Sequence, residues 1–433
     1  MVVFRYLLLV AVILMGIARI RITLLLLALP ENFQERDILQ IYLMAKGLIS
    51  GLNPYLPLNV LTEIYIGPFT YFPHPAPYPP FNAVLFTPLL AFNYLNAIYV
   101  WYIFELLSLA AIACILTILW KGRLSGIIAI IIFFIILAWY PVMADLAVGQ
   151  LSILLTLLIL TALLALKKGY RISAGVLIGF SLAIKMITWP LIIYFALKKD
   201  WKVVISSVTT AIGLNLIALI VMGSGPFFEY YLNVSTQVMN FYQAESANFS
   251  IWSIGYRLFT GTGSPVFAYS LKAPPLLDMP EIAPIFSSIL AIACLLVGLI
   301  LAVKSKDSYI GFAIMVCTIV AVSPIVWDHY FVILLICMAI LIRILARQSF
   351  PFWHSLIFTF TVLLYFLFND HIGALILSMN GGNELVQANG YQITFASSLL
   401  SMLPMIELII LTVLLWHSGI NGRQINNSMI QTK

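Results

Sequence analysis

Asp37 is the acidic side chain best placed for chemistry in this sequence. It follows the first long apolar run, residues 6–29, and opens a polar loop. A carboxylate at such a position can accept a proton from an incoming hydroxyl group, which is general-base catalysis. The same position also suits an ordinary helix start on a solvated face, because the helix dipole favours a carboxylate in the first turn. Both interpretations are open from the spacing alone.

Lys185 is a charged residue inside an apolar stretch, residues 172–197. An ammonium group there needs a phosphate, a carboxylate or a polar cavity, because ionisable groups within a membrane are costly. If the helix is continuous, the lysine can instead extend toward the lipid headgroups. The sequence does not separate these two interpretations.

Two further sets of side chains suit an anionic or sugar substrate. Asp328 and His329 stand together in a short turn after Pro324, where a carboxylate beside an imidazole can bind phosphate, orient a sugar or move protons. A plain polar turn between two helices fits them equally well. Arg257 lies in an amphipathic stretch of a long loop, and its planar guanidinium group would bind phosphate well.

The composition predicts what kind of element holds these residues. The chain has 433 residues, of which 63% are hydrophobic and only 9% are charged. A soluble domain has about 25% charged residues. The mean hydropathy of +1.07 excludes a soluble or disordered chain, and it excludes nucleic-acid binding despite the pI of about 9.0. We therefore predict an all-α polytopic membrane protein.

Apolar runs mark the expected spanning helices, which together number roughly 11–13 at about 20 residues each. Residues 80–93 are too short to span comfortably and predict a half-helix. Residues 172–197 are too long for one helix and contain Lys185 and Pro190, so we expect a broken helix or hairpin with its tip at membrane depth. The other runs cover residues 6–29, 96–120, 124–141, 150–167, 203–222, 284–303, 308–326, 329–347, 352–368 and 396–417.

The distribution of Lys and Arg predicts the orientation, because these residues concentrate in cytoplasmic loops. With the N-terminus inside, fifteen of them fall in inner segments and four in outer ones. Both termini are then cytoplasmic, and the long loops at residues 30–80, 223–283 and 369–395 lie outside. Long loops on one face predict a functional site on that face. Residues 1–433 are expected to form a single integral-membrane domain.

The first outer loop has two distinctive segments. Residues 38–46 have an amphipathic pattern that suits a helix lying in the membrane interface. Residues 71–80, with the sequence YFPHPAPYPP, combine prolines with aromatic rings. Such a run is stiff and amphipathic, and it predicts a fixed surface at the level of the headgroups.

Several short motifs, in order along the chain, resemble the integral-membrane glycosyltransferases of the GT-C fold, and most of all glycosyltransferase family 87. The first is an aspartate after the first span, here Asp37. A departure is Tyr330, where the family often has a second histidine. The other motifs are Gly51-x-Asn53-Pro54-Tyr55, Tyr78-Pro79-Pro80, Gly149-Gln150-Leu151-Ser152, Gly175-x-x-x-Gly179 before Lys185, Asn248-x-Ser250 before Arg257, and Ser323-Pro324-x-x-Trp327-x-His329.

The resemblance implies an enzyme that moves a sugar, with mannose as the family-level expectation. The donor would be a polyprenyl or dolichyl monophosphate sugar, and the acceptor a hydroxyl group of a glycolipid or glycan. Asp37 would be the general base of an inverting reaction, and the donor phosphate would be held by Arg257, Lys185 and His329. Substrate contacts are expected from Asn53, Tyr55, His74, Tyr78, Gln150, Trp327 and Asp328.

The sequence lacks the motifs of nucleotide-driven and zinc-driven chemistry, namely a Gly-Lys-Ser/Thr loop, a His-Glu-x-x-His helix and a cysteine cluster. We therefore expect no cofactor, no metal and no nucleic-acid partner, only membrane lipids and the two substrates. The plasma membrane is the expected location, with the site on its extracytoplasmic side. A secondary transporter, or a flippase of a lipid-linked or small anionic substrate, is the alternative, because broken helices and buried charges also serve transport.

Overall fold

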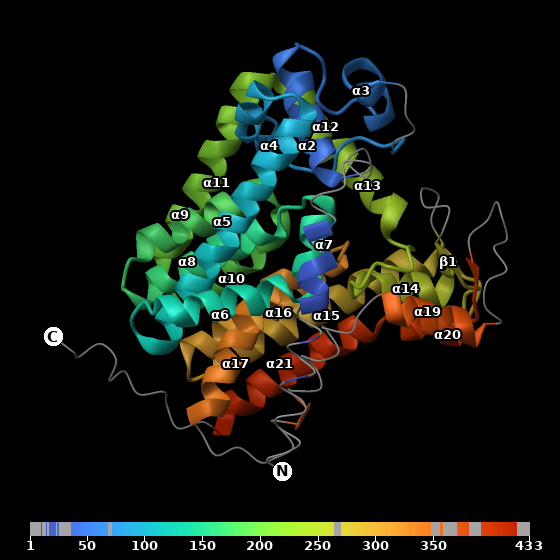
Figure 1. Cartoon of the computed structure of the whole chain (residues 1–433). Coiled ribbons are helices and arrows are strands. Elements are labelled where there is room, and N and C mark those ends of the chain that lie inside the picture. The colour runs from blue at the N-terminus through green and yellow to red at the C-terminus, as the bar shows by residue number, and fades with distance from the viewer. Residues whose placement is uncertain are drawn as a thin grey trace.

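The computed structural model describes residues 36–67, 72–263, 270–347, 370–380 and 391–421, with isolated positions among residues 10–25 and 356–357. Most of the expected span at residues 6–29, nearly all of the span at residues 352–368 and part of the loop at residues 369–395 therefore lie outside the described residues. The described part is almost entirely helical (Figure 1). It is the structure of an all-α polytopic membrane protein.

The described residues from 36 to 222 form a bundle of helices (Figure 1). Two short 3₁₀ segments, η2 (Thr87–Ala91) and η3 (Met186–Thr188), lie between them. The helices are α2 (Asp37–Ile49), α3 (Leu58–Tyr65), α4 (Phe81–Leu85), α5 (Tyr94–Lys121), α6 (Gly126–Leu137), α7 (Tyr140–Val148), α8 (Ser152–Lys167), α9 (Arg171–Ile184), α10 (Trp189–Leu197) and α11 (Trp201–Met222).

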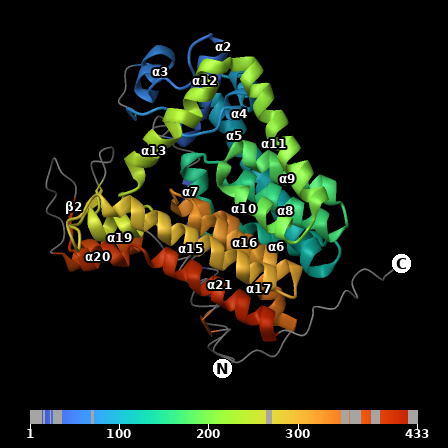
Figure 2. The same cartoon turned by 180° about the vertical axis from the view of Figure 1, so that it is seen from behind.

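The second half contains a layer formed by helices α15, α16, α17 and α21, with α19, α20 and β2 at its end (Figure 2). A π-helical turn, η4 (Tyr230–Val234), joins α12 to α13, and the 3₁₀ turn η5 (Asp328–Leu334) precedes α17. Strands β1 (Leu271–Lys272) and β2 (Tyr391–Gln392) pair in parallel. The helices are α12 (Ser224–Glu229), α13 (Ser235–Tyr242), α14 (Trp252–Phe259), α15 (Ile282–Lys304), α16 (Ser308–Val322), α17 (Leu335–Arg347), α19 (Asp370–Met379), α20 (Phe395–Leu400) and α21 (Leu403–Asn421).

Helix length separates the expected spans into two groups. Within the described residues, four helices are long and apolar enough to cross a membrane: α5, α11, α15 and the helix Asp328–Leu345. The bent pair α6 and α7 makes a fifth span if it is counted as one. The other expected runs that the structure describes form shorter apolar helices. Among the described residues, helices long enough to span a membrane are therefore fewer than the spanning helices expected from the sequence. The shorter ones are Phe81–Ala91, Ser152–Lys167, Arg171–Ile184, Met186–Leu197, Ser308–Val322 and Leu403–Gly419.

Two apolar runs are broken rather than continuous. The run at 172–197 stops at Ile184, passes through an extended Lys185 (φ −148°, ψ 120°) and resumes as η3 and α10, with Pro190 in the first turn. This confirms the expected broken helix. The run at 124–141 bends by 71° between α6 and α7, just before Pro141. Proline lacks an N–H and tolerates only the first turn of a helix, which explains both restarts. The short run at 80–93 is the expected half-helix, formed by α4 and η2.

The helices α9 and α11 pack closely because glycine removes side chains at their crossing. A Cβ atom on Gly175 would lie 1.9 Å from the Ser206 hydroxyl oxygen, and one on Gly179 would lie 2.3 Å from the Ser207 carbonyl oxygen. Both are far inside van der Waals contact, so any larger residue would push α11 away. The Gly-x-x-x-Gly spacing noted in the sequence therefore serves helix packing. This packing fixes the end of α9, where Lys185 emerges.

The two segments of the first outer loop are more buried than expected. Helix α2 is buried almost all round, from Ile38 to Ala45, under α3, α4 and η2. The prediction of an interfacial helix at residues 38–46 is therefore wrong, although α3 does expose one face with Val60 and Ile64. The segment 72–80 is also largely buried and lines a cavity instead of forming a surface at headgroup level. Packing of neighbouring helices over both segments explains the difference.

The basic connections that were expected to lie inside gather at one end of the bundle. The Lys198 ammonium donates a hydrogen bond to the Val303 carbonyl at 3.0 Å, and Arg171 pairs with Asp200. Arg343 donates to the Leu119 carbonyl at 2.9 Å, which brings the ends of α17 and α5 together. Connections that carry most of the lysines and arginines therefore share one end.

Candidate active site

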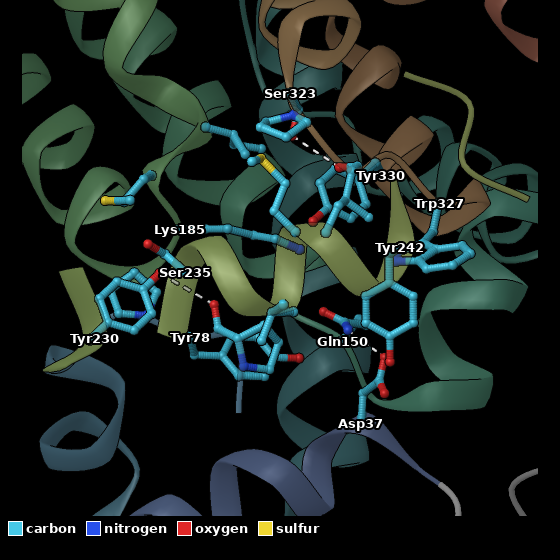
Figure 3. Close-up of a pocket in the computed structure, with 18 of the residues that line it drawn as sticks. Asp37, Tyr78, Gln150, Lys185, Tyr230, Ser235, Tyr242, Ser323, Trp327 and Tyr330 are labelled. Carbon is cyan, nitrogen blue, oxygen red and sulfur yellow. Dashed lines mark hydrogen bonds between the residues drawn. The ribbon is translucent and has the colours of Figure 1, made fainter. Parts of the chain in front are cut away.

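One large cavity is lined by polar residues from both halves of the chain. Its volume is about 550 Å³. It lies between the start of α2, segment 72–80, the α7–α8 link, the break between α9 and α10, helix α13 and the link from α16 to η5 (Figure 3). Its polar lining comes from Asp37, Gln40, His74, Tyr78, Gln150, Lys185, Tyr242, Ser323 and Tyr330, whereas its apolar lining includes Leu182, Met186, Ile187, Trp189, Val238, Met239, Ile319 and Val322.

Asp37 is the first residue of α2, and both of its carboxylate oxygens accept hydrogen bonds. Gln40 Nε2 donates to Oδ1 at 2.6 Å, and Gln150 Nε2 donates to Oδ2 at 2.5 Å. Gln40 lies one helical turn after Asp37, a spacing that places both side chains on one face. The helix dipole adds stabilisation for a carboxylate at this end. Asp37 is held as an oriented carboxylate facing the cavity, which is the geometry that a general base requires.

Gly149 is the reason that Gln150 reaches Asp37. It ends α7 with φ +68°, a conformation that residues with a side chain rarely adopt. A Cβ atom on Gly149 would also lie 3.0 Å from the Cβ of Ile38, the residue after Asp37. The turn after α7 can therefore approach α2 closely only with glycine at this position. The Gly-Gln motif identified in the sequence thus couples α7 to the base.

Replacing Gly149 by alanine is expected to misplace Gln150 and lower activity at this site. A left-handed conformation costs a non-glycine residue about 1–2 kcal/mol, and the new methyl group must also displace Ile38. A shift of about 1 Å in a catalytic group can cost about 100-fold in rate. Gly51→Ala is the matched control, because Gly51 has φ +74° but nothing within 4 Å of its Cβ position. Equal transfer rates and thermal stabilities for the two variants would contradict this role of Gly149.

Lys185 projects into the cavity from the break between α9 and α10 (Figure 3). Its Nζ atom lies 3.7 Å from the centroid of the Tyr330 ring, a cation–π contact. Among the described residues no carboxylate lies within ion-pair distance of this ammonium group, and none accepts a hydrogen bond from it. Of the two interpretations of Lys185, the structure favours the polar cavity. The group is suited to bind an anion that enters the cavity.

Three aromatic side chains shape the polar end of the cavity. Tyr78 and Tyr230 are both almost fully buried and line it, and the Tyr78 hydroxyl lies close to Gln150. Tyr242 packs edge-on against Trp327, with ring centroids 5.5 Å apart, and its hydroxyl bonds to His74. Tyr230 belongs to the π-helical turn η4, and such turns are frequent at functional sites. His74, Tyr78 and Trp327 thus lie at the cavity, as predicted for substrate-binding residues.

Sequence reasoning missed Gln40, Tyr230 and Tyr242. The i, i+3 spacing from Asp37 would have identified Gln40. For the two tyrosines the sequence carries no such signal, because α12, η4 and α13 reach the cavity only through the fold. Tyr330 was noted only as a departure from the family pattern, yet it contacts Lys185.

Asn53 and Tyr55 lie behind the cavity wall instead of in it. The Asn53 side chain accepts a hydrogen bond from the Tyr55 backbone at 2.9 Å and donates one to Glu229 at 2.6 Å. The buried Tyr55 hydroxyl donates to the Tyr78 carbonyl at 2.9 Å. The Asn-Pro-Tyr motif therefore ties segment 72–80 and α12 together. These two residues hold the wall, and neither reaches a substrate in the cavity.

Asp328 and His329 also stand outside the cavity lining. Asp328 accepts hydrogen bonds from the Tyr140 hydroxyl and from the His329 backbone, both at 2.9 Å. Its Oδ1 atom lies 3.6 Å from His329 Nδ1. His329 is buried, and its ring packs on Tyr330. The pair supports the turn that places Tyr330 over Lys185, and the expected direct contact of His329 with a donor phosphate has no support in this geometry.

Arg257 is fully buried away from the cavity. One terminal nitrogen donates to the Ser398 carbonyl and the Ser401 hydroxyl, each at 2.9 Å, and the other donates to the Ser246 carbonyl at 2.6 Å. These contacts join α14 to α20 across more than 140 residues of sequence. Burial lowers the pKa of Arg257 to about 10, so the group remains charged at neutral pH. Both terminal nitrogens already have acceptors within the protein, so the guanidinium group does not fit the expected role of a phosphate ligand.

Substitution of Arg257 by methionine is expected to destabilise the protein by several kcal/mol. Each buried acceptor left without a donor costs about 1–3 kcal/mol. Arg171→Met is the matched control, because its ion pair with Asp200 is half exposed and surface pairs contribute about 0–1 kcal/mol. Thermal unfolding in detergent measures both variants. An Arg257 variant of parental stability with a raised KM for a lipid phosphate sugar would instead restore the phosphate role.

The fold and this site define a class: a polytopic membrane protein with an oriented carboxylate and an ammonium group in one amphipathic cavity. Residues 77–325 match glycosyltransferase family 87, which is more than half of the chain. The protein belongs to glycosyltransferase family 87 and is a membrane glycosyltransferase. A search of curated proteins finds no match. The matched residues include Gln150 and Lys185 but begin after Asp37.

Proposed function

We propose that this glycosyltransferase takes its sugar from a polyprenyl or dolichyl monophosphate and transfers it to the hydroxyl group of a glycolipid or glycan. The observation that carries the proposal is that a single cavity combines polar side chains, among them Asp37, Gln150 and Lys185, with many apolar ones. A lipid phosphate sugar combines the same two characters, because its phosphate and sugar are polar and its chain is not. Mannose is the sugar expected from the family resemblance.

Asp37 is the general base of the proposed reaction. It accepts the proton of the acceptor hydroxyl as that oxygen forms a bond to the anomeric carbon. The bond between this carbon and the phosphate oxygen breaks, and the electron pair leaves with the lipid phosphate. Attack opposite the leaving group inverts the anomeric centre. The two amide donors on Asp37, from Gln40 and Gln150, support this role because they orient the carboxylate.

Lys185 is the proposed ligand of the donor phosphate. A cation placed where negative charge develops on the leaving group lowers the barrier. Its position at a helix break, with only the Tyr330 ring against its ammonium group, supports this role. Of the three cations first considered, Lys185 alone lines the cavity, since Arg257 and His329 do not. One lysine can neutralise a monophosphate, so the proposed chemistry uses no metal and no cofactor.

The site faces the extracytoplasmic side of the plasma membrane in this proposal. The basic connections that share one end of the bundle support it, because cytoplasmic loops carry the excess of Lys and Arg. Asp37 lies in a different region, near the long loops that were assigned to the outside.

Transfer in nanodiscs tests the proposal directly. The purified protein is given radiolabelled polyprenyl-phosphate-mannose and a panel of lipid-linked acceptors, with and without a chelator. We expect a glycosylated acceptor and free lipid phosphate in equal amounts, at a rate that the chelator does not change. Movement of the lipid phosphate sugar across liposomes without any covalent change would instead establish a flippase.

A further inference from the structure

His74 is held in a fixed orientation at the edge of the site. Its ring is buried with 1% of its surface exposed, stacks on Phe72 at a centroid distance of 5.3 Å and touches Phe241. Burial lowers the pKa of His74 below its ordinary value, which favours the neutral imidazole at pH 7. A neutral imidazole has one N–H donor and one acceptor nitrogen.

The two ring nitrogens of His74 have different partners, which defines the tautomer. Nδ1 lies 2.8 Å from the Pro75 carbonyl oxygen, which can only accept a hydrogen bond, so Nδ1 carries the proton. Nε2 is then the acceptor, and it lies 2.5 Å from the Tyr242 hydroxyl oxygen. The Tyr242 hydroxyl therefore donates its proton to His74. A carbonyl partner on one nitrogen commonly fixes the role of the other.

Tyr242 stands between His74 and the proposed base. Its hydroxyl group points toward the Asp37 carboxylate in Figure 3. Since its proton is directed to His74, the hydroxyl presents an oxygen lone pair to Asp37. We propose that His74 is a positioning residue that acts through Tyr242, directing the Tyr242 proton away from Asp37 so that this carboxylate stays a strong base. The inference rests on the proposed function of Asp37.

The physical effect follows from how a carboxylate responds to hydrogen-bond donors. Each donor to the ionised form favours it and weakens the base. Asp37 accepts two amide donors in the structure, and a hydroxyl donor would add a third. The titratable groups that interact with Asp37 from the surrounding elements are His74 and Tyr78 of segment 72–80, Tyr94 of α5, Lys185 after α9, Tyr242 of α13 and Tyr330 of η5. Of these groups, Tyr242 is the one whose hydroxyl donates its hydrogen bond to a histidine, His74.

A double-mutant cycle measured over a pH range tests the inference. His74→Phe keeps a ring beside Phe72 but removes the acceptor, so the Tyr242 hydroxyl is free to donate to Asp37. We expect the acidic limb of the kcat profile to move to lower pH and the plateau to fall by about 10-fold or more, because a weaker base transfers the proton more slowly. The double variant, His74→Phe with Tyr242→Phe, lacks this hydroxyl. The acidic limb of its pH profile should therefore lie at the same pH as in Tyr242→Phe alone. His74→Gln supplies an amide acceptor and should keep the parental limb.

Two results would overturn the inference while leaving the proposed function intact: an unmoved limb in His74→Phe, or a shifted limb that persists in the double variant. Loss of transfer by the parent itself is a different failure, since it removes the proposed function. The tautomer is therefore also measured without activity, by ¹⁵N NMR of histidine-labelled protein, with His74→Gln assigning the signal among five histidines. We expect the proton on Nδ1 and a change at Nε2 in Tyr242→Phe. A proton on Nε2 contradicts the inference whatever the activity.

Discussion

Replacing Asp37 by asparagine is expected to reduce sugar transfer by about 10²- to 10⁴-fold, the usual contribution of a general base. Asparagine has nearly the same shape, so α2 and the contact with Gln150 should persist, but the amide cannot accept the proton of the acceptor hydroxyl. The loss should fall on kcat, with binding of the lipid phosphate sugar unchanged. Initial rates and donor binding in nanodiscs, measured on the same preparation, separate the two quantities.

Asp278→Asn is the control for this substitution. It makes the same chemical change at an exposed carboxylate in the loop before α15, away from the cavity lining. We expect transfer at the parental rate. Undiminished transfer by the Asp37 variant would remove Asp37 from the mechanism. Asp328 would then be the next carboxylate to replace, and the proposed role of Tyr242 would fall with that of Asp37.

Replacing Lys185 by methionine is expected to lower kcat/KM for the lipid phosphate donor by about 30- to 3,000-fold. This range corresponds to the roughly 2–5 kcal/mol that is lost when one partner of a buried charge pair is truncated. Methionine preserves most of the side-chain length, so the break between α9 and α10 should persist. Part of the loss should appear as weaker binding of the free lipid phosphate, which can be titrated without any transfer.

Lys185→Arg and Lys202→Met complete this experiment. Arginine keeps the charge but not the compact ammonium group, so we expect partial recovery. Lys202 is exposed at the start of α11, and its loss should leave donor binding unchanged. Binding of lipid phosphate at parental strength by Lys185→Met would assign the phosphate to another group, and the cation–π contact with Tyr330 would then be purely structural.

The class of protein and most of its helices could be predicted from the sequence, because hydrophobic runs and charge placement act locally. The broken helix around Lys185 followed from a charge and a proline inside an apolar run, and the structure confirms it. Asp37 and Gln150 were both singled out, although their hydrogen bond joins α2 to the turn after α7. The number of long spanning helices was less predictable, because helix breaks near the cavity shorten several of them.

The fold of the first outer loop was not predictable in the same way. Residues 38–46 have an amphipathic pattern, yet α2 is covered on its polar side as well. The covering helices come from segments later in the chain, and no local pattern reports their positions. The position of Tyr242 was not predictable from the sequence either. Tyr242 lies near Asp37 only because the π-helical turn and α13 line the same cavity.

The sequence by itself determined that this is a helical membrane protein with a carboxylate at the start of a helix and a lysine at a helix break. The tertiary structure decided which of the candidate cations meets that carboxylate in one cavity. Arg257 and Lys185 were equally plausible phosphate ligands by residue type. The two terminal nitrogens of Arg257 donate to acceptors near residues 246 and 398, whereas the Lys185 ammonium group contacts the Tyr330 ring inside the cavity. Whether a charge is available to a substrate depends on partners distant in sequence, and only the folded chain brings those partners together.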